Sequence, residues 1–193
     1  MPEISFTTPP DEVVIELVKQ LDAFGVDYAV GGALAIGLWS EPRSTIDVDI
    51  TLFLDPKTPD QCVSLLESIG CGIDKDKATA MLREFGYCRV SWRDCTVDIF
   101  LPTTPFLISA KHRRSSLLFC GREVRFWNAE VMAVLKMMFF RQKDFVDLEK
   151  VIRAQGTNLD RVWVRQKLEE MFGHFDPRLT TWDELCADVD SES

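Results

Sequence analysis

YAVGGALAIGLWSEPRSTIDVDI, residues Tyr28–Ile50, changes its pattern twice within one short stretch. It begins as an apolar strand, breaks at the pair Gly31 and Gly32, and continues as ALAIGLW, which predicts a short helix. The chain then returns in STIDVDITLFL as a second strand, because apolar and polar residues alternate there. A strand, a glycine turn, a short helix and another strand are therefore expected in this order.

Two aspartates lie in the second strand. Asp47 and Asp49 are two positions apart, so their carboxylates project from the same face. The aliphatic residues Ile46, Val48 and Ile50 are expected on the opposite face. Two carboxylates this close repel each other unless a cation or a proton lies between them, and Mg²⁺ commonly uses one or two carboxylates. The pair predicts a metal site; the alternative is two solvated acids on an amphipathic strand.

A third carboxylate and the glycine pair extend this hypothesis. Asp98 lies in the strand-like run TVDIF, and it completes a two-metal site if this run is adjacent to the strand of Asp47 and Asp49. Alone, Asp98 is better explained as a surface residue. Gly31 and Gly32 open a helix, where bare backbone N–H groups can approach a phosphate. The alternative for them is a tight strand-to-helix turn.

The composition fits a folded, cytoplasmic protein that binds no membrane. The 193 residues are 46% hydrophobic, with no apolar run of membrane-spanning length and no N-terminal leader pattern. The six cysteines lack the spacing of a zinc or redox site. A net charge of −9 argues against extended contact with nucleic acid, although a basic segment runs from Lys111 to Arg125 and includes His112. The acidic end, TWDELCADVDSES, is expected to be a loose helix or a frayed terminus.

The expected fold class is α/β (α+β), with a mixed sheet, flanking helices and a C-terminal helical subdomain. Residues 1–127 are expected to form the α/β core and residues 128–193 the helices. The first helix is expected to begin at a capping residue, Asp11. Two hairpins are expected, one around Arg93 and Asp94 and one around Gly121.

Three other phosphate or cation motifs do not fit. The residues after Asp49 lack the ligands and the glycine of a calcium loop, and no GxxxxGK[ST] motif is present. A dinucleotide-binding turn is a weaker alternative: an acidic residue follows the glycines at roughly the expected distance, but Ala33 replaces the second glycine of that fingerprint.

Taken together, these motifs resemble the polymerase-β-like nucleotidyltransferase superfamily. The resemblance rests on the glycine pair, on PRSTIDVDI and on VDIF, and the later LKMMFFRQKDFVDLEKVI is similar to the small bacterial branch that includes AbiEii-type toxins. It covers roughly residues 28–152. The separation of Gly32 from Asp47 is slightly longer than is usual in the superfamily, so the placement of the glycine turn stays open.

The resemblance implies transfer of a nucleoside monophosphate from a nucleoside triphosphate, with release of pyrophosphate. It assigns Asp47, Asp49 and Asp98 to Mg²⁺ or Mn²⁺ ligation and catalysis. It also assigns a group of residues to the phosphates, namely Gly31, Gly32, Arg43, Ser44, Thr45, Lys136 and Lys143. Lys136 has the alternative of a surface lysine. Lys143, Asp144 and Asp147 have the alternative of local capping and ion pairing.

The acceptor stays open at this stage. The resemblance allows tRNA, a protein hydroxyl, or a small molecule such as an aminoglycoside or a lincosamide, and it allows a toxin that is paired with an antitoxin protein. Two rival functions are a catalytically inactive relative that binds a nucleotide or a partner, and a dinucleotide-binding module. The three aspartates argue against an inactive relative, which has no need to keep like charges together.

Overall fold

The computed structural model describes residues 8–192, which form two compact units. The first unit contains residues 8–34 and Ser44–Phe126, and the second contains Ala35–Arg43 and residues 127–192. The predicted domain division, 1–127 and 128–193, stays a prediction.

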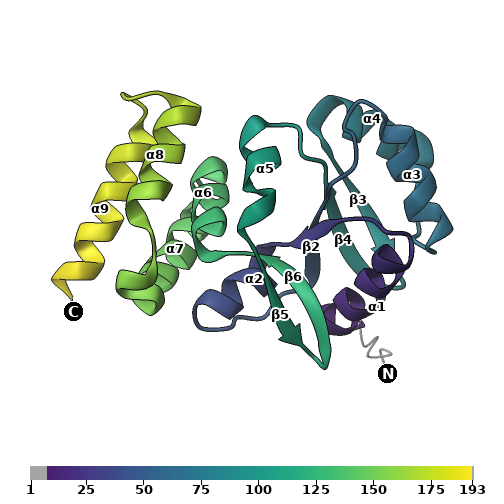
Figure 1. Cartoon of the computed structure of the whole chain (residues 1–193), viewed down its shortest axis with the longest axis horizontal. Helices are drawn as coiled ribbons and strands as arrows, with labels where there is room; N and C mark the ends of the chain where they lie inside the picture. The colour runs from purple at the N-terminus through teal and green to yellow at the C-terminus, as the bar shows by residue number, and fades with distance from the viewer. Residues whose placement is uncertain (1–7, 193) are drawn as a thin grey trace, which may run out of the picture. The chain divides into compact units, whose positions relative to one another are not determined.

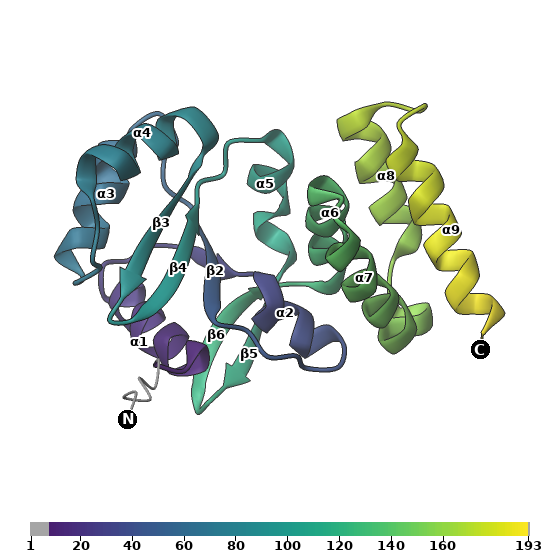
Figure 2. The same ribbon diagram turned by 180° about the vertical axis from the view of Figure 1, so that it is seen from behind.

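The first unit is built on a mixed six-stranded sheet. Its strands are β1 (Tyr28–Val30), β2 (Asp47–Leu52), β3 (Tyr87–Trp92), β4 (Cys95–Phe100), β5 (Arg114–Phe119) and β6 (Arg122–Trp127). Their order across the sheet is β3-β4-β2-β1-β6-β5, so the two predicted hairpins lie at opposite edges (Figure 2). β1 pairs antiparallel with β2 and parallel with β6, while β2 pairs parallel with β4. The sheet is mixed, as predicted.

The helices of this unit pack on the sheet or on each other. They are α1 (Pro10–Ala23), α3 (Pro59–Ser68), α4 (Lys75–Phe85) and α5 (Pro105–Ala110). Figure 1 shows α3 beside α4, and α4 contacts β3. Apolar residues of α1 are completely buried, namely Val13, Val14, Leu17, Val18 and Leu21. The prediction that Asp11 caps α1 is wrong: Pro9 is the N-cap residue, and Asp11 lies inside the first turn.

The helix α2 (Gly32–Trp39) begins in the first unit and ends in the second. Its later part is tied to the second unit by two hydrogen bonds. The Trp39 indole donates to the Trp127 carbonyl (2.8 Å), and the Gln155 amide donates to the Trp39 carbonyl (2.7 Å).

The rest of the second unit is helical. It contains α6 (Ala129–Phe139), α7 (Gln142–Gln155), α8 (Arg161–Phe172) and α9 (Pro177–Ser191). Asn128, Asp160 and Asp176 cap α6, α8 and α9 through their side chains. The acidic end of the chain is not loose up to residue 192: α9 buries one face, made of Leu179, Trp182, Leu185 and Val189. No helix among residues 8–192 is both long and apolar enough to cross a membrane.

Candidate active site

The strand β2 presents Asp47 and Asp49 on one face. Both are partly exposed, whereas Val48 and Ile50, which alternate with them, are 0% and 1% exposed. The predicted alternation therefore holds from Asp47 to Ile50, whereas Thr51 and Leu52, which follow in the strand, are both buried. It fails for Ile46, which lies before the first strand residue and is 82% exposed, because a side chain outside the pleat is not held against the core.

Asp98 lies beside this pair. β4 runs parallel to β2, and Asp98 is the register partner of Asp49. Neighbouring strands are about 5 Å apart, so partners in register project from the same face at this spacing. The adjacency that the sequence left as an assumption is confirmed. Like charges placed opposite each other across strands are unfavourable, so the arrangement costs stability unless a cation offsets it.

The glycine turn contacts the same acids. The Gly31 N–H donates to the Asp49 carbonyl (2.8 Å), and Gly32 has φ +59°, a conformation that favours glycine. A Cβ on Gly32 would lie 1.8 Å from Oδ2 of Asp49. The missing side chain therefore makes room for the Asp49 carboxylate at the start of α2. The bare backbone of the helix N-terminus and this carboxylate are immediate neighbours.

Arg89 of β3 binds Asp98. The guanidinium donates through Nε to Oδ1 (2.7 Å) and through Nη2 to Oδ2 (2.8 Å), and these hydrogen bonds raise the pKa of Arg89. Arg89 was not among the predicted site residues. Its signal was present in the hairpin, because residues equally far from the two-residue turn at Arg93 and Asp94 pair across the strands, and Arg89 and Asp98 are such a pair.

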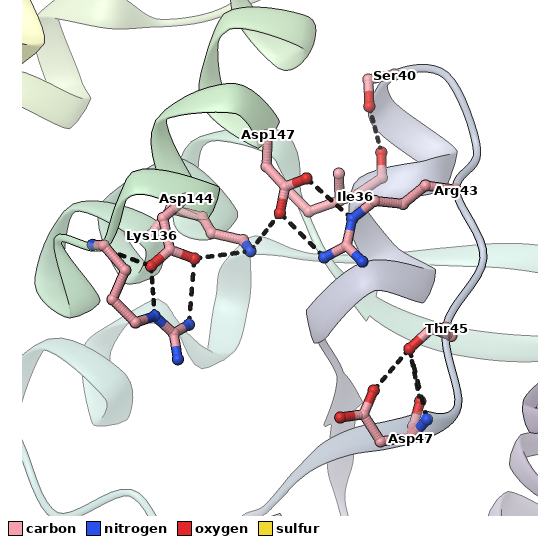
Figure 3. Close-up of polar contacts among 9 residues, drawn as sticks. Ile36, Ser40, Arg43, Thr45, Asp47, Lys136, Asp144 and Asp147 are labelled. Carbon is pink, nitrogen blue, oxygen red and sulfur yellow. Dashed lines mark hydrogen bonds and ion pairs between the residues drawn. The ribbon is translucent and has the colours of Figure 1, made fainter.

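The residues before β2 make a local contact with Asp47. The Thr45 hydroxyl donates to Oδ1 of Asp47 (2.6 Å), which fixes the orientation of this carboxylate (Figure 3). Ser44 precedes Thr45 in the same connecting segment. The phosphate contacts predicted for Ser44 and Thr45 stay predictions.

A second group of charged residues lies within the second unit. The Lys136 ammonium donates to Asp144 (3.0 Å) and to Asp147 (2.6 Å), as Figure 3 shows, and all three side chains are buried. Arg43 donates to both oxygens of Asp147, at 2.9 and 3.1 Å. Arg141 binds both oxygens of Asp144, at 2.7 and 3.1 Å. Lys136 is thus not the surface lysine that the sequence left as an alternative.

The ion pairs of this group keep its acids ionised. Burial raises the pKa of Asp147, but hydrogen bonds from Arg43 and Lys136 outweigh it and hold the pKa below its usual value. Burial likewise raises the pKa of Asp144, and hydrogen bonds from Arg141 and Lys136 bring it below the usual value. Asp144 also caps α7 by accepting from the Arg141 N–H (3.2 Å), so the capping alternative holds for it. Lys143 is exposed on α7.

The basic segment of the first unit is matched by acids. Arg122 pairs with Asp22 (2.8 Å), Lys111 pairs with Asp27 (2.7 Å), and Arg125 binds both acids. Arg114 also donates to Asp27. These cations therefore form ion pairs with two carboxylates of the same unit. Although burial raises the pKa of Asp27, these hydrogen bonds and charges bring it well below its ordinary value.

The donor set fits Mg²⁺ in part. Asp47 and Asp49 supply oxygen ligands from one strand face, and Mg²⁺ completes its shell with water and substrate phosphates when it has one or two carboxylates. Within residues 8–192, however, no three His, Cys, Asp or Glu side chains are gathered as a metal site. The residues fit a two-carboxylate site, not a preassembled site of three.

No protein-family model matches the chain, and no curated protein sequence matches it. Solved structures share its fold. The crystal structure of ANT(2'')-Ia in complex with adenylyl-2''-tobramycin has a TM-score of 0.56 at 13% identity, covering 94% of this chain and 97% of that one. The solution structure of the same antibiotic-resistance factor has a TM-score of 0.54 at 12% identity, covering 94% of this chain and 91% of that one. The crystal structure of lincomycin-bound LnuA, a lincosamide antibiotic adenylyltransferase, has a TM-score of 0.51 at 13% identity, covering 74% of this chain and 96% of that one. The chain thus has the mixed α/β fold of nucleotidyltransferases.

Proposed function

We propose that the protein is a metal-dependent nucleotidyltransferase that transfers a nucleoside monophosphate from a nucleoside triphosphate to an acceptor hydroxyl. One observation carries the proposal: Asp49 lies in register with Asp98 and two positions after Asp47, while its carboxylate occupies the space that Gly32 leaves at the start of α2. The fold supports it, since ANT(2'')-Ia and LnuA share it.

In the proposed reaction the acceptor oxygen forms a bond to the α-phosphorus, and the bond from that phosphorus to the bridging oxygen of pyrophosphate breaks. The products are the nucleotidylated acceptor and pyrophosphate. Asp98 takes the proton of the acceptor hydroxyl, as a general base. The N–H groups at the start of α2 are donors for phosphate oxygens, because a helix N-terminus carries unpaired N–H groups and a partial positive charge.

Asp47 and Asp49 would hold the metal ion. When it is bound, Mg²⁺ or Mn²⁺ neutralises the negative charge that develops on the phosphate oxygens. Thr45 holds Asp47 in one orientation through the 2.6 Å hydrogen bond. Phosphate contacts by Arg43 and Lys136 stay predictions, and a phosphate would have to compete with Asp147 for both cations.

We infer a small or compact acceptor. A nucleic-acid acceptor usually requires unmatched cations along its phosphates, but Lys111, Arg114, Arg122 and Arg125 already bind Asp22 and Asp27. ANT(2'')-Ia was solved with an adenylylated aminoglycoside and LnuA with lincomycin, so small acceptors occur within this fold. A tRNA acceptor and a toxin with an antitoxin partner stay predictions.

The inactive relative is the rival function. It explains the fold equally well, but it gives no reason for Asp47 and Asp49 to share one strand face beside the start of α2. Polar groups that lower stability persist where a ligand or a reaction needs them.

The experiment is a transfer assay. The protein is incubated with Mg²⁺, each α-labelled nucleoside triphosphate and one of four acceptors: an aminoglycoside, lincomycin, total RNA or a protein extract. We expect labelled small molecule and equimolar pyrophosphate, with a loss of at least about 1000-fold in Asp49→Asn. Asp76→Asn, an exposed acid of α4, is the matched control and should transfer normally. Equal label transfer by wild type and Asp49→Asn, or none with any acceptor, would overturn the proposal.

A further inference from the structure

We infer that Arg89 is a positioning residue that reserves Asp98 for the acceptor, so that Asp47 and Asp49 alone form the resident metal pair. The inference rests on the proposed function and adds to it a division of labour among the three acids. It starts from the row of residues that crosses three neighbouring strands in register: Arg89 on β3, Asp98 on β4 and Asp49 on β2.

The geometry fixes Asp98 firmly. Both oxygens of Asp98 accept from one guanidinium, and this two-point contact sets the plane of the carboxylate as well as its position. The side chain of Asp98 is only 11% exposed, whereas that of Arg89 is 61% exposed. The Asp98 carboxylate is therefore mostly buried, whereas the Arg89 side chain that binds it stays mostly exposed.

The strand β3 holds the base of Arg89 in turn. Its neighbours along the strand, Cys88 and Val90, are 0% and 5% exposed and point into the core. Tyr87, on the same face as Arg89, stacks on Phe100 at 5.6 Å between ring centroids. The Cα of Arg89 is thus fixed by the core on one side of the strand and by an aromatic pair on the other.

The charges then separate the three acids into two groups. The guanidinium offsets the charge of Asp98 and occupies a coordinating position on each of its oxygens. A divalent ion that recruited Asp98 would have to displace this contact or lie beside a positive charge. Arg89 makes its two hydrogen bonds to Asp98, whereas Asp47 raises the pKa of Arg89 through its charge.

The test measures Mn²⁺ binding without nucleotide or acceptor, by the electron paramagnetic resonance signal of free Mn²⁺. Four proteins are compared with the wild type: Arg89→Met, Arg89→Lys, Asp98→Asn and the double variant Arg89→Met/Asp98→Asn. Circular dichroism melting confirms that each is folded, and Arg89→Lys retains a charge in case Arg89→Met does not fold.

We expect Asp98→Asn to bind Mn²⁺ within about two-fold of wild type, because Asp98 is not a resident ligand. Arg89→Met should bind about ten-fold more tightly, since a positive charge is removed and Asp98 is released to the metal. The double variant should lose this gain, and Arg89→Lys should lie between wild type and Arg89→Met. An arginine with no influence on the three acids would give none of these shifts.

Two results would overturn the inference. One is a loss of ten-fold or more in Mn²⁺ affinity in Asp98→Asn alone, which would make Asp98 a resident ligand. The other is unchanged affinity in both Arg89 variants. Transfer kinetics separate this failure from that of the proposed function: Arg89→Met should lower kcat about ten-fold with the KM for nucleotide unchanged. If no protein transfers label but the Mn²⁺ pattern holds, the proposed function fails and the division of the acids stands.

Discussion

Two groups of aspartates, one in each unit, differ in their arrangement: Asp144 with Asp147, and Asp49 with Asp98. In the second unit, all four carboxyl oxygens of Asp144 and Asp147 are bonded to Lys136, Arg43 or Arg141. In the first unit, by contrast, Asp49 is placed in register with another acid. Buried acids whose oxygens are all bonded to cations of the protein are typical of a structural role. Asp98 is paired with Arg89, whereas Asp47 and Asp49 lie partly exposed on one face of β2, in the arrangement that ligands of a metal ion would take.

The largest expected effect in the comparison of the two acidic groups is the loss of stability in Lys136→Met. Lys136→Met leaves two buried acids without their shared cation, and we expect the free energy of unfolding to fall by about 3 kcal/mol. Urea unfolding of wild type and variant measures it. Transfer activity per folded molecule should change less than about ten-fold. A stable variant without activity would instead make Lys136 a phosphate ligand, as the resemblance implied.

The next effect tests the site at its glycine. Gly32→Ala places a Cβ against Oδ2 of Asp49 and should lower transfer about 100-fold by displacing this carboxylate. The matched control is Gly25→Ala. Gly25 has a similar φ of +66°, but no atom lies within 4 Å of its added Cβ. Both variants should lose about 1 kcal/mol of stability from backbone strain. Equal activity of the two alanine variants would show that the contact with Asp49 has no function.

These contacts show where the sequence was sufficient. The alternation in β2 predicted the shared face of Asp47 and Asp49, because a strand's side chains alternate whatever surrounds it. The pairing of Asp98 with Asp49 depends on which strands become neighbours, which no local pattern contains. The sequence could therefore predict the three-aspartate site only on the condition that the strands of Asp49 and Asp98 are neighbours. The pairing of Arg89 with Asp98 could have been predicted from the sequence, since the position of the turn fixes the register of a hairpin.

The second unit shows what sequence patterns missed. A lysine among apolar residues in α6 fits both a surface and a buried position, and only the packing of α6 on α7 decides between them. In the final helix, α9, the apolar residues Leu179, Trp182 and Leu185 have helical spacing in the sequence. The high acidic content of this segment nevertheless led to the prediction of a loose helix or a frayed terminus. In the first unit, the short helix α5 (Pro105–Ala110) was not predicted, because six residues are too few for a periodic pattern.

A smaller effect follows from acidity. The pKa values of Asp144 and Asp147 lie below their usual value in the folded protein, so both acids bind protons more readily when unfolded. Their stabilisation is complete above the unfolded pKa of about 4 and is lost as the pH falls below it. Urea midpoints measured from pH 6 to pH 3 should therefore fall on the acid side, and less steeply in Lys136→Met. An equal slope in both proteins would contradict the role of the lysine.

The smallest effect is at Thr45. Thr45→Val removes the hydroxyl that orients Asp47 and keeps the side-chain shape, and we expect transfer to fall about five-fold, the value of one hydrogen bond. Steady-state kinetics at varied Mg²⁺ should place the loss in the Mg²⁺ requirement. Thr45→Ser keeps the hydroxyl and should retain the wild-type value. A loss common to both variants would assign it to packing instead.

The most direct test of the central claim compares the two acidic groups in one binding experiment. Calorimetric titration with a non-hydrolysable nucleoside triphosphate and Mn²⁺ would be run on wild type, on Asp47→Asn/Asp49→Asn and on folded Lys136→Met. We predict that the double variant binds at least about 100-fold more weakly without losing thermal stability, while Lys136→Met binds within about three-fold of wild type. Wild-type affinity in the double variant would contradict the claim that the acids of β2 hold the metal and the nucleotide.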